Sequence, residues 1–206
     1  MQGLLLAGLF QAGGMGYYLL VLVFMALLVA LYIWGSSRKD KGSRGDDLQA
    51  RYKEMDREKL DALPDEELVN AVAANLMGKL DSRKPDAYRT IPLLSHGRCL
   101  VYSIWLICHE LDEAGFEELF ASPSADFIEL AADGMQELGA LRCATALRGA
   151  MDNNADEAAL ADLHADFLEA AVDENPLSLC VGYIRDNLDQ FVDSDKESET
   201  YSTLDL

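Results

Sequence analysis

The chain has 206 residues, with 36 Asp or Glu against 17 Lys or Arg, and its formal net charge is −19 at pH 7. From residue 99 onward its only basic residues are Arg142, Arg148, Arg185 and Lys196. Such a charge repels nucleic acid and anionic lipid and attracts basic protein surfaces, so we do not expect direct nucleic-acid binding. The length predicts one folded domain with accessory segments.

The first predicted element is a transmembrane helix. No charged side chain precedes Arg38, and residues 17–34 form one apolar run with Tyr17 and Trp34 at its ends. That length and those aromatic ends are typical of a membrane span. A cleaved signal peptide is the alternative, but the basic start and the small-residue cleavage site that it requires are both missing. We therefore expect residues 1–37 to contain an uncleaved anchor.

Basic residues follow the span in the linker 38–45 and are expected to lie at the membrane surface: Arg38, Lys39, Lys41 and Arg44. The positive-inside rule then places the N-terminus outside and the rest of the chain in the cytoplasm, where thiols stay reduced. Several glycines precede the span and permit close helix packing, which makes a homodimer through the anchor an open alternative: Gly8, Gly13, Gly14 and Gly16.

The remaining chain divides into three predicted parts. Residues 46–63 mix both charge signs with few apolar residues, which predicts a solvated helical arm. Residues 64–192 show helical periodicity and no strand alternation of useful length, so they predict an acidic all-α domain. Residues 193–206 are polar and acidic, which predicts a disordered tail. The expected fold is a single all-α domain of about six to seven helices preceded by one transmembrane helix.

Local signals predict several helix boundaries within that domain. The apolar run 99–111 predicts a central helix that is buried on nearly all sides. Ser122 and Pro123 have the residue types of an N-cap and a first helical position. Gly139 is expected to end one helix and Pro176 to begin the last one. The apolar residues expected to face the core from this last helix are Leu177, Val181, Ile184, Leu188 and Phe191.

Two helical segments carry carboxylates one turn apart, and these are the predicted partner-binding residues: Asp126, Glu129, Asp133 and Glu137 in the first row, and Asp162, Asp166, Glu169 and Asp173 in the second. Carboxylates one turn apart lie about 5 to 6 Å from each other, a spacing near that of successive phosphates along a strand. Each row can therefore engage the lysines and arginines that neutralise a nucleic-acid backbone. The alternative is the solvated face of an ordinary amphipathic helix.

Catalytic chemistry has little support in the sequence. His109 and Glu110 begin like a zinc-protease helix, but Glu113 stands where the second histidine is required. A metal-dependent hydrolase that uses these three residues is a further alternative. No glycine-rich phosphate loop, nucleophile elbow or paired cysteine spacing accompanies them. We expect no catalytic residue, no metal site and no cofactor.

The segment from Glu110 to Phe120, with its continuation to Gly139 and Ala140, resembles the bacterial DNA mimic protein 19 family over roughly residues 61–192. The residues that carry this resemblance are Glu110, Gly115, Phe116, Phe120, Gly139 and Ala140. The chain departs from the family pattern by having Asp112, Glu113 and Ala114 where Asn-Asn-Gly is usual. The resemblance implies a helical fold and an acidic surface, similar to duplex DNA, that captures a DNA-binding transcription regulator.

Two functional hypotheses follow. The first is a non-catalytic domain at the inner face of the bacterial cytoplasmic membrane that binds a basic protein surface, by mimicking DNA phosphates and sequestering a DNA-binding protein. The alternative is a membrane-tethered structural or assembly scaffold that makes apolar contacts through its transmembrane helix.

Overall fold

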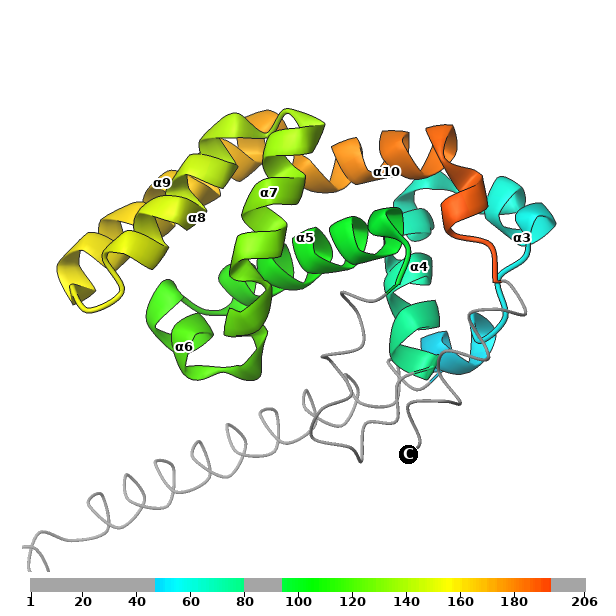
Figure 1. Ribbon diagram of the computed structural model, residues 1–206, viewed down its shortest axis with the longest axis horizontal. Helices are drawn as coiled ribbons and strands as arrows, with labels where there is room; N and C mark the ends of the chain where they lie inside the picture. Colours follow the sequence, from blue (N-terminus) through cyan, green and yellow to red (C-terminus); the bar gives the residue numbers. More distant parts are fainter. Residues whose placement is uncertain (1–46, 80–93, 194–206) are drawn as a thin grey trace, which may run out of the picture. The chain divides into compact units, whose positions relative to one another are not determined.

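The helical periodicity of the sequence is matched by helices in the computed structural model, which describes residues 47–79 and 94–193 (Figure 1). Those residues contain no strand, so the predicted all-α class is confirmed for them. A short helix over residues 47–51 comes first. The further elements are α3 (Arg57–Ala62), α4 (Asp65–Lys79), α5 (His96–Glu113), α6 (Phe116–Ala121), η2 (Pro123–Phe127), α7 (Ile128–Leu138), α8 (Leu141–Asp152), α9 (Glu157–Glu174), α10 (Pro176–Asp186) and η3 (Leu188–Gln190).

The helix boundaries predicted at Ser122, Gly139 and Pro176 are present in the structure. Ser122 caps η2 with its side chain, and Pro123 lies in the first turn of that 3-10 helix. Gly139 ends α7 in the left-handed conformation, with φ 92°. Asn175 also has a positive φ, of 45°, and its side chain accepts from the backbone amide of Ser178 as α10 begins. These caps satisfy backbone groups that a helix end leaves unpaired.

The helices outnumber the six to seven that were expected. Two of the additional elements, α3 and α6, have 6 residues each, which is less than two turns and too short to show a hydrophobic period. The segment after Ser122 also differs, because residues 123–127 form a 3-10 helix before α7 begins. Asp126 therefore lies on η2, while the other three carboxylates of its row lie on α7.

Helix α5 is central, since α4, α7 and α10 all pack against it (Figure 1). Its first half is buried, but Trp105 and Cys108 are half-buried and His109 is exposed. The expectation that it would be buried on nearly all sides is therefore wrong for its second half. Helix α4 meets that description better, because every residue from position 71 to 76 is buried.

Helix α8 lies between α7 and α9 and packs against both (Figure 1). Its buried positions Ala144, Ala146 and Ala150 are small, which lets the neighbouring helices approach closely. At Gly149 an added Cβ would lie 2.9 Å from the Cδ2 atom of Leu163 on α9. The alanines and this glycine explain why α8 can be enclosed from two sides and still present one face to solvent.

Residues 47–63 do not form the solvated arm that their composition predicted. Tyr52, Met55 and Leu60 are buried in the same core as α4 and α5. The side-chain amide of Asn75 donates to the backbone oxygen of Tyr52 at 2.8 Å, and Arg185 donates to the oxygen of Leu60 at 2.8 Å. Leu48 of this segment stays exposed, but the spacing of Tyr52, Met55 and Leu60 lets these three reach the core, which net composition does not reveal.

Three of the predicted parts lie outside the described residues. These are the transmembrane helix at 17–34, the basic linker 38–45 with Arg38, Lys39, Lys41 and Arg44, and the tail from residue 194 onward. Within residues 47–79 and 94–193, no helix has both the length and the apolar character needed to cross a membrane. Asp193, expected to begin the tail, instead pairs with Arg98 inside the domain.

Candidate protein-binding surface

The first carboxylate row follows from the amphipathic pattern of α7. This helix buries Ile128, Ala131, Ala132, Gly134 and Met135 against the core. Glu129, Asp133 and Glu137 lie on its opposite side and are exposed, as is Asp126 on η2. Three of the four predicted residues are therefore spaced by one turn on a single helix, while Asp126 extends the acidic surface without the same α-helical spacing.

The second row lies entirely on α9. This helix buries Leu160, Phe167 and Ala170, and all four predicted carboxylates are exposed. They occupy positions 162, 166, 169 and 173, so each lies about one turn from the next. The prediction that this row shares one helix is confirmed.

Two arginines of α8 connect that helix to both rows. Arg142 donates to Asp173 at 2.6 Å and to Glu169 at 2.9 Å, both on α9. Arg148 donates to Asp133 on α7 at 2.8 Å. Sequence analysis missed this arrangement, although Arg142 and Arg148 are two of the few basic residues in this half of the chain. The two rows thus flank α8, and an arginine from α8 neutralises part of each.

The eight carboxylates are consequently of two kinds. Glu137 bonds to the His96 ring at 2.9 Å, and Asp133, Glu169 and Asp173 pair with the arginines of α8. The remaining four have no ion-pair partner within the part of the chain that the structure describes: Asp126, Glu129, Asp162 and Asp166. No internal ion pair neutralises these four carboxylates, so each can pair with an external cation.

Glu174 fixes the position of α9 against the start of α8. The residue before α8, Ala140, has no side chain that can cap the helix. Glu174 substitutes for it by accepting from the backbone amides of Arg142 at 2.8 Å and Cys143 at 3.0 Å. Burial opposes ionisation of this carboxyl, but the two amide bonds outweigh it and lower the pKa of Glu174. A carboxylate at a helix N-terminus also stabilises the helix dipole.

A groove of about 420 Å³ runs between α8 and α9 beside the second row. Leu141, Ala146 and Leu163 supply its apolar wall, and Asp166 lies at its edge. The acidic surface is therefore not purely charged, because an exposed leucine adjoins one of the four unpaired carboxylates.

The residues that carry the family resemblance have structural roles. Glu110 accepts from the Ser124 hydroxyl at 2.9 Å, which ties α5 to η2. Gly115 is the N-cap of α6, and Phe116 packs against Phe120 and Phe167 with ring centroids 6.2 and 6.4 Å apart. Gly139 and the buried Ala140 form the tight connection from α7 to α8.

The three residues of the hydrolase alternative do not converge on one point. His109 stacks on Trp105, with ring centroids 5.6 Å apart, and its Nε2 atom lies 3.9 Å from Glu113. Glu110 instead bonds to Ser124. Among residues 47–79 and 94–193, no group of three or more His, Cys, Asp or Glu side chains is placed to hold a metal ion.

Comparison with known proteins identifies the family. The family model described as DMP19-like protein matches residues 93–205, and the chain belongs to this family. The match begins later than the resemblance seen in the sequence, so α3 and α4 lie outside it. No curated protein and no solved structure matches the chain.

Proposed function

We propose that this chain is a non-catalytic interaction protein whose acidic surface on η2, α7 and α9 binds a basic surface of another protein. The observation that carries the proposal is the set of four unpaired carboxylates, Asp126, Glu129, Asp162 and Asp166, on either side of α8. An exposed carboxylate without a partner gains Coulomb energy from an approaching lysine or arginine and loses no internal ion pair.

The finer part of the proposal concerns the partner. The resemblance described above implies that the surface imitates the phosphates of duplex DNA and sequesters a DNA-binding protein such as a transcription regulator. The one-turn spacing of the α9 row supports this, because it offers regularly spaced negative charges to a protein whose own surface is arranged for phosphates. Membership in the DMP19-like family is consistent with the same role.

The proposal also includes a location. The apolar run 17–34 and the basic linker 38–45 are the basis for placing the domain at the cytoplasmic face of a bacterial inner membrane. There the basic linker contacts anionic head groups, while the acidic domain is repelled from them. The surface on α7 and α9 would then remain available to a soluble basic partner.

The proposal is tested with fluorescent octalysine as a probe and the full chain in a nonionic detergent. The double variant Asp162→Asn and Asp166→Asn removes two unpaired charges from α9. The matched control, Glu58→Gln and Asp61→Asn, removes the same charge from exposed positions on α3. We expect the α9 variant to weaken octalysine binding severalfold at low salt, with the difference shrinking as salt is added, and the control to have little effect.

Equal loss of binding in the two variants would contradict the proposal, because net charge alone would then explain the affinity. Binding that resists high salt would contradict it as well, since screening must weaken contacts between exposed charges.

A further inference from the structure

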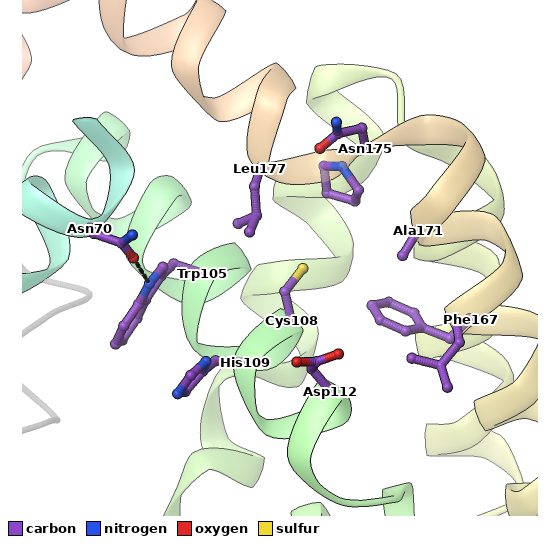
Figure 2. A pocket seen from close by; sticks show the side chains of 11 residues that line it. Asn70, Trp105, Cys108, His109, Asp112, Phe167, Ala171, Asn175 and Leu177 are labelled. Carbon is purple, nitrogen blue, oxygen red and sulfur yellow. Dashed lines mark hydrogen bonds between the residues drawn. The ribbon is translucent and has the colours of Figure 1, made fainter. Parts of the chain in front are cut away.

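A second surface feature lies on the other side of α9 from its carboxylates. A cavity of about 330 Å³ opens between α5, α9 and the beginning of α10. Figure 2 shows Trp105, Cys108 and Asp112 of α5 on one side of this cavity and Phe167 of α9 on the other, with Leu177 of α10 above it. The second half of α5 forms one wall of the cavity, although the whole run 99–111 was expected to be buried on nearly all sides.

The lining of the cavity is mostly apolar and partly aromatic. Trp105 is held in place from two directions, because its indole nitrogen donates to Asn70 at 2.9 Å and its ring stacks on His109 at 5.6 Å. Cys108 adds a thiol whose pKa is raised by burial, so it is uncharged at neutral pH. The polar lining residues are Asn70, His109, Asp112 and Asn175, and a cavity of this size with apolar and aromatic walls and some polar groups is typical of a binding site.

Exposed aliphatic side chains extend the cavity outward. Leu168 and Leu177 line its edge and are 39% and 38% exposed. Val172 lies one helical turn after Leu168 on α9 and is 82% exposed. Such a group of large apolar side chains around an open cavity marks an interaction surface more often than a solvated one.

Charge decides between the candidate occupants. Asp112 lines the cavity, is exposed, and points its carboxylate toward the cavity in Figure 2. A second copy of this chain would bring its own Asp112 to a two-fold interface around the cavity, where the two carboxylates would repel each other. A partner segment with cations beside its apolar residue has the complementary charge.

We propose that this cavity, with Leu168, Val172 and Leu177, is the anchor site for one large apolar side chain of the basic partner, and that a cation next to that side chain pairs with Asp112. The inference rests on the proposed function, because it takes the partner to be basic. It adds that recognition is not electrostatic alone, since one buried side chain supplies contacts that DNA phosphates do not make.

The test uses two short peptides of equal charge, Lys-Lys-Phe-Lys-Lys and Lys-Lys-Ala-Lys-Lys, each carrying a fluorophore, with the full chain in nonionic detergent and an empty-micelle blank. Burial of the phenyl group should make the first peptide bind about tenfold more tightly or better. The double variant Leu168→Gln and Val172→Thr should abolish that preference. Leu141→Gln, which changes an exposed leucine on α8, should keep it.

A second readout avoids changing the cavity. The chain has two tryptophans, so Trp34→Phe leaves Trp105 as the only one. The phenylalanine peptide should then change the emission of Trp105, while the alanine peptide should not. Asp112→Asn should weaken both peptides to a similar degree and preserve their ratio, because it removes a charge contact that both make.

Each other outcome overturns the inference in a recognisable way. Equal, salt-sensitive binding of the two peptides would leave the proposed function standing and remove the anchor site. Failure of both peptides to bind at low salt would overturn the proposed function and the inference together. Loss of the preference in Leu141→Gln alone would place the anchor in the groove between α8 and α9. A dimer that becomes monomeric in the Leu168 and Val172 variant would show that a second copy occupies the site.

Discussion

Arg98 donates from Nη2 to the Asp193 carboxylate at 2.8 Å, and the arginine side chain is only 1% exposed. This pair joins the first turn of α5 to the last described residue of the chain. Lys79 and the backbone amide of Met55 also bond to Asp193. A single carboxylate thus connects α4, α5 and the segment before α3, although it was expected to belong to the tail.

The substitution Asp193→Asn should therefore destabilise the domain. It removes the charge of Asp193 from its ion pair with the buried Arg98, and removing one partner of a buried pair costs about 3 kcal/mol. Asp189→Asn is the matched control, since Asp189 pairs with Arg57 at the surface and its loss should cost less than about 1 kcal/mol. Urea unfolding of the two variants measures both values, and equal midpoints would refute the role given to Asp193.

The same residue predicts a dependence of stability on pH. Burial acts to raise the pKa of Asp193, but the bonds from Lys79, Arg98 and the Met55 amide outweigh it, and the pKa is lowered from 3.8. The carboxylate therefore stabilises the domain fully above its unfolded pKa, and this contribution is lost as the pH falls through the folded value. The free-energy difference between the wild type and Asp193→Asn should be constant near neutral pH and shrink below pH 3.8. A difference that stays unchanged down to the lowest accessible pH would count against this assignment.

Removal of an α8 arginine should strengthen binding to a basic probe. Arg142→Gln releases Glu169 and Asp173, so octalysine affinity at low salt should rise about two- to fivefold. The domain should lose little stability, because the pairs are exposed. Arg57→Gln removes the same charge from a surface pair elsewhere and is the control. If both variants bind octalysine equally well, the position of the released carboxylates has no importance.

Deletion of residues 1–44 should remove the attachment of the chain to the membrane without removing its binding to a basic probe. The chain divides between Asp47 and Leu48 into two units, and the described core lies in the second. The shortened chain should leave the membrane fraction, keep its helical circular-dichroism spectrum and bind octalysine as the full chain does. Loss of binding with an intact spectrum would favour the alternative of a membrane-tethered scaffold.

The candidate surface was predictable only in part. The α9 row was correctly assigned to one exposed helix because a 3.6-residue period is visible in the sequence alone. The first row was predicted to lie on one helix, but Asp126 lies on the 3-10 helix η2 and only the other three carboxylates lie on α7. The sequence before Phe127 does not distinguish a 3-10 turn from an α-helical one. The last helix was misread in another way: Leu177 has the expected spacing but is 38% exposed, because Pro176, Cys180 and Ile184 face the core instead.

What the sequence by itself determined is local: the all-α class, the helix-boundary signals at Ser122, Gly139 and Pro176, and the resemblance that the family model bears out. Each depends on residues within a few positions of one another, where sequence order and spatial order coincide. Only the tertiary structure decided which carboxylates are free, because Arg142 reaches Asp173 from 31 positions away. It also decided that Trp105 and Phe167 share one cavity and that Asp193 belongs to the core. Contacts of this kind depend on how helices pack, and packing is set by the whole chain together.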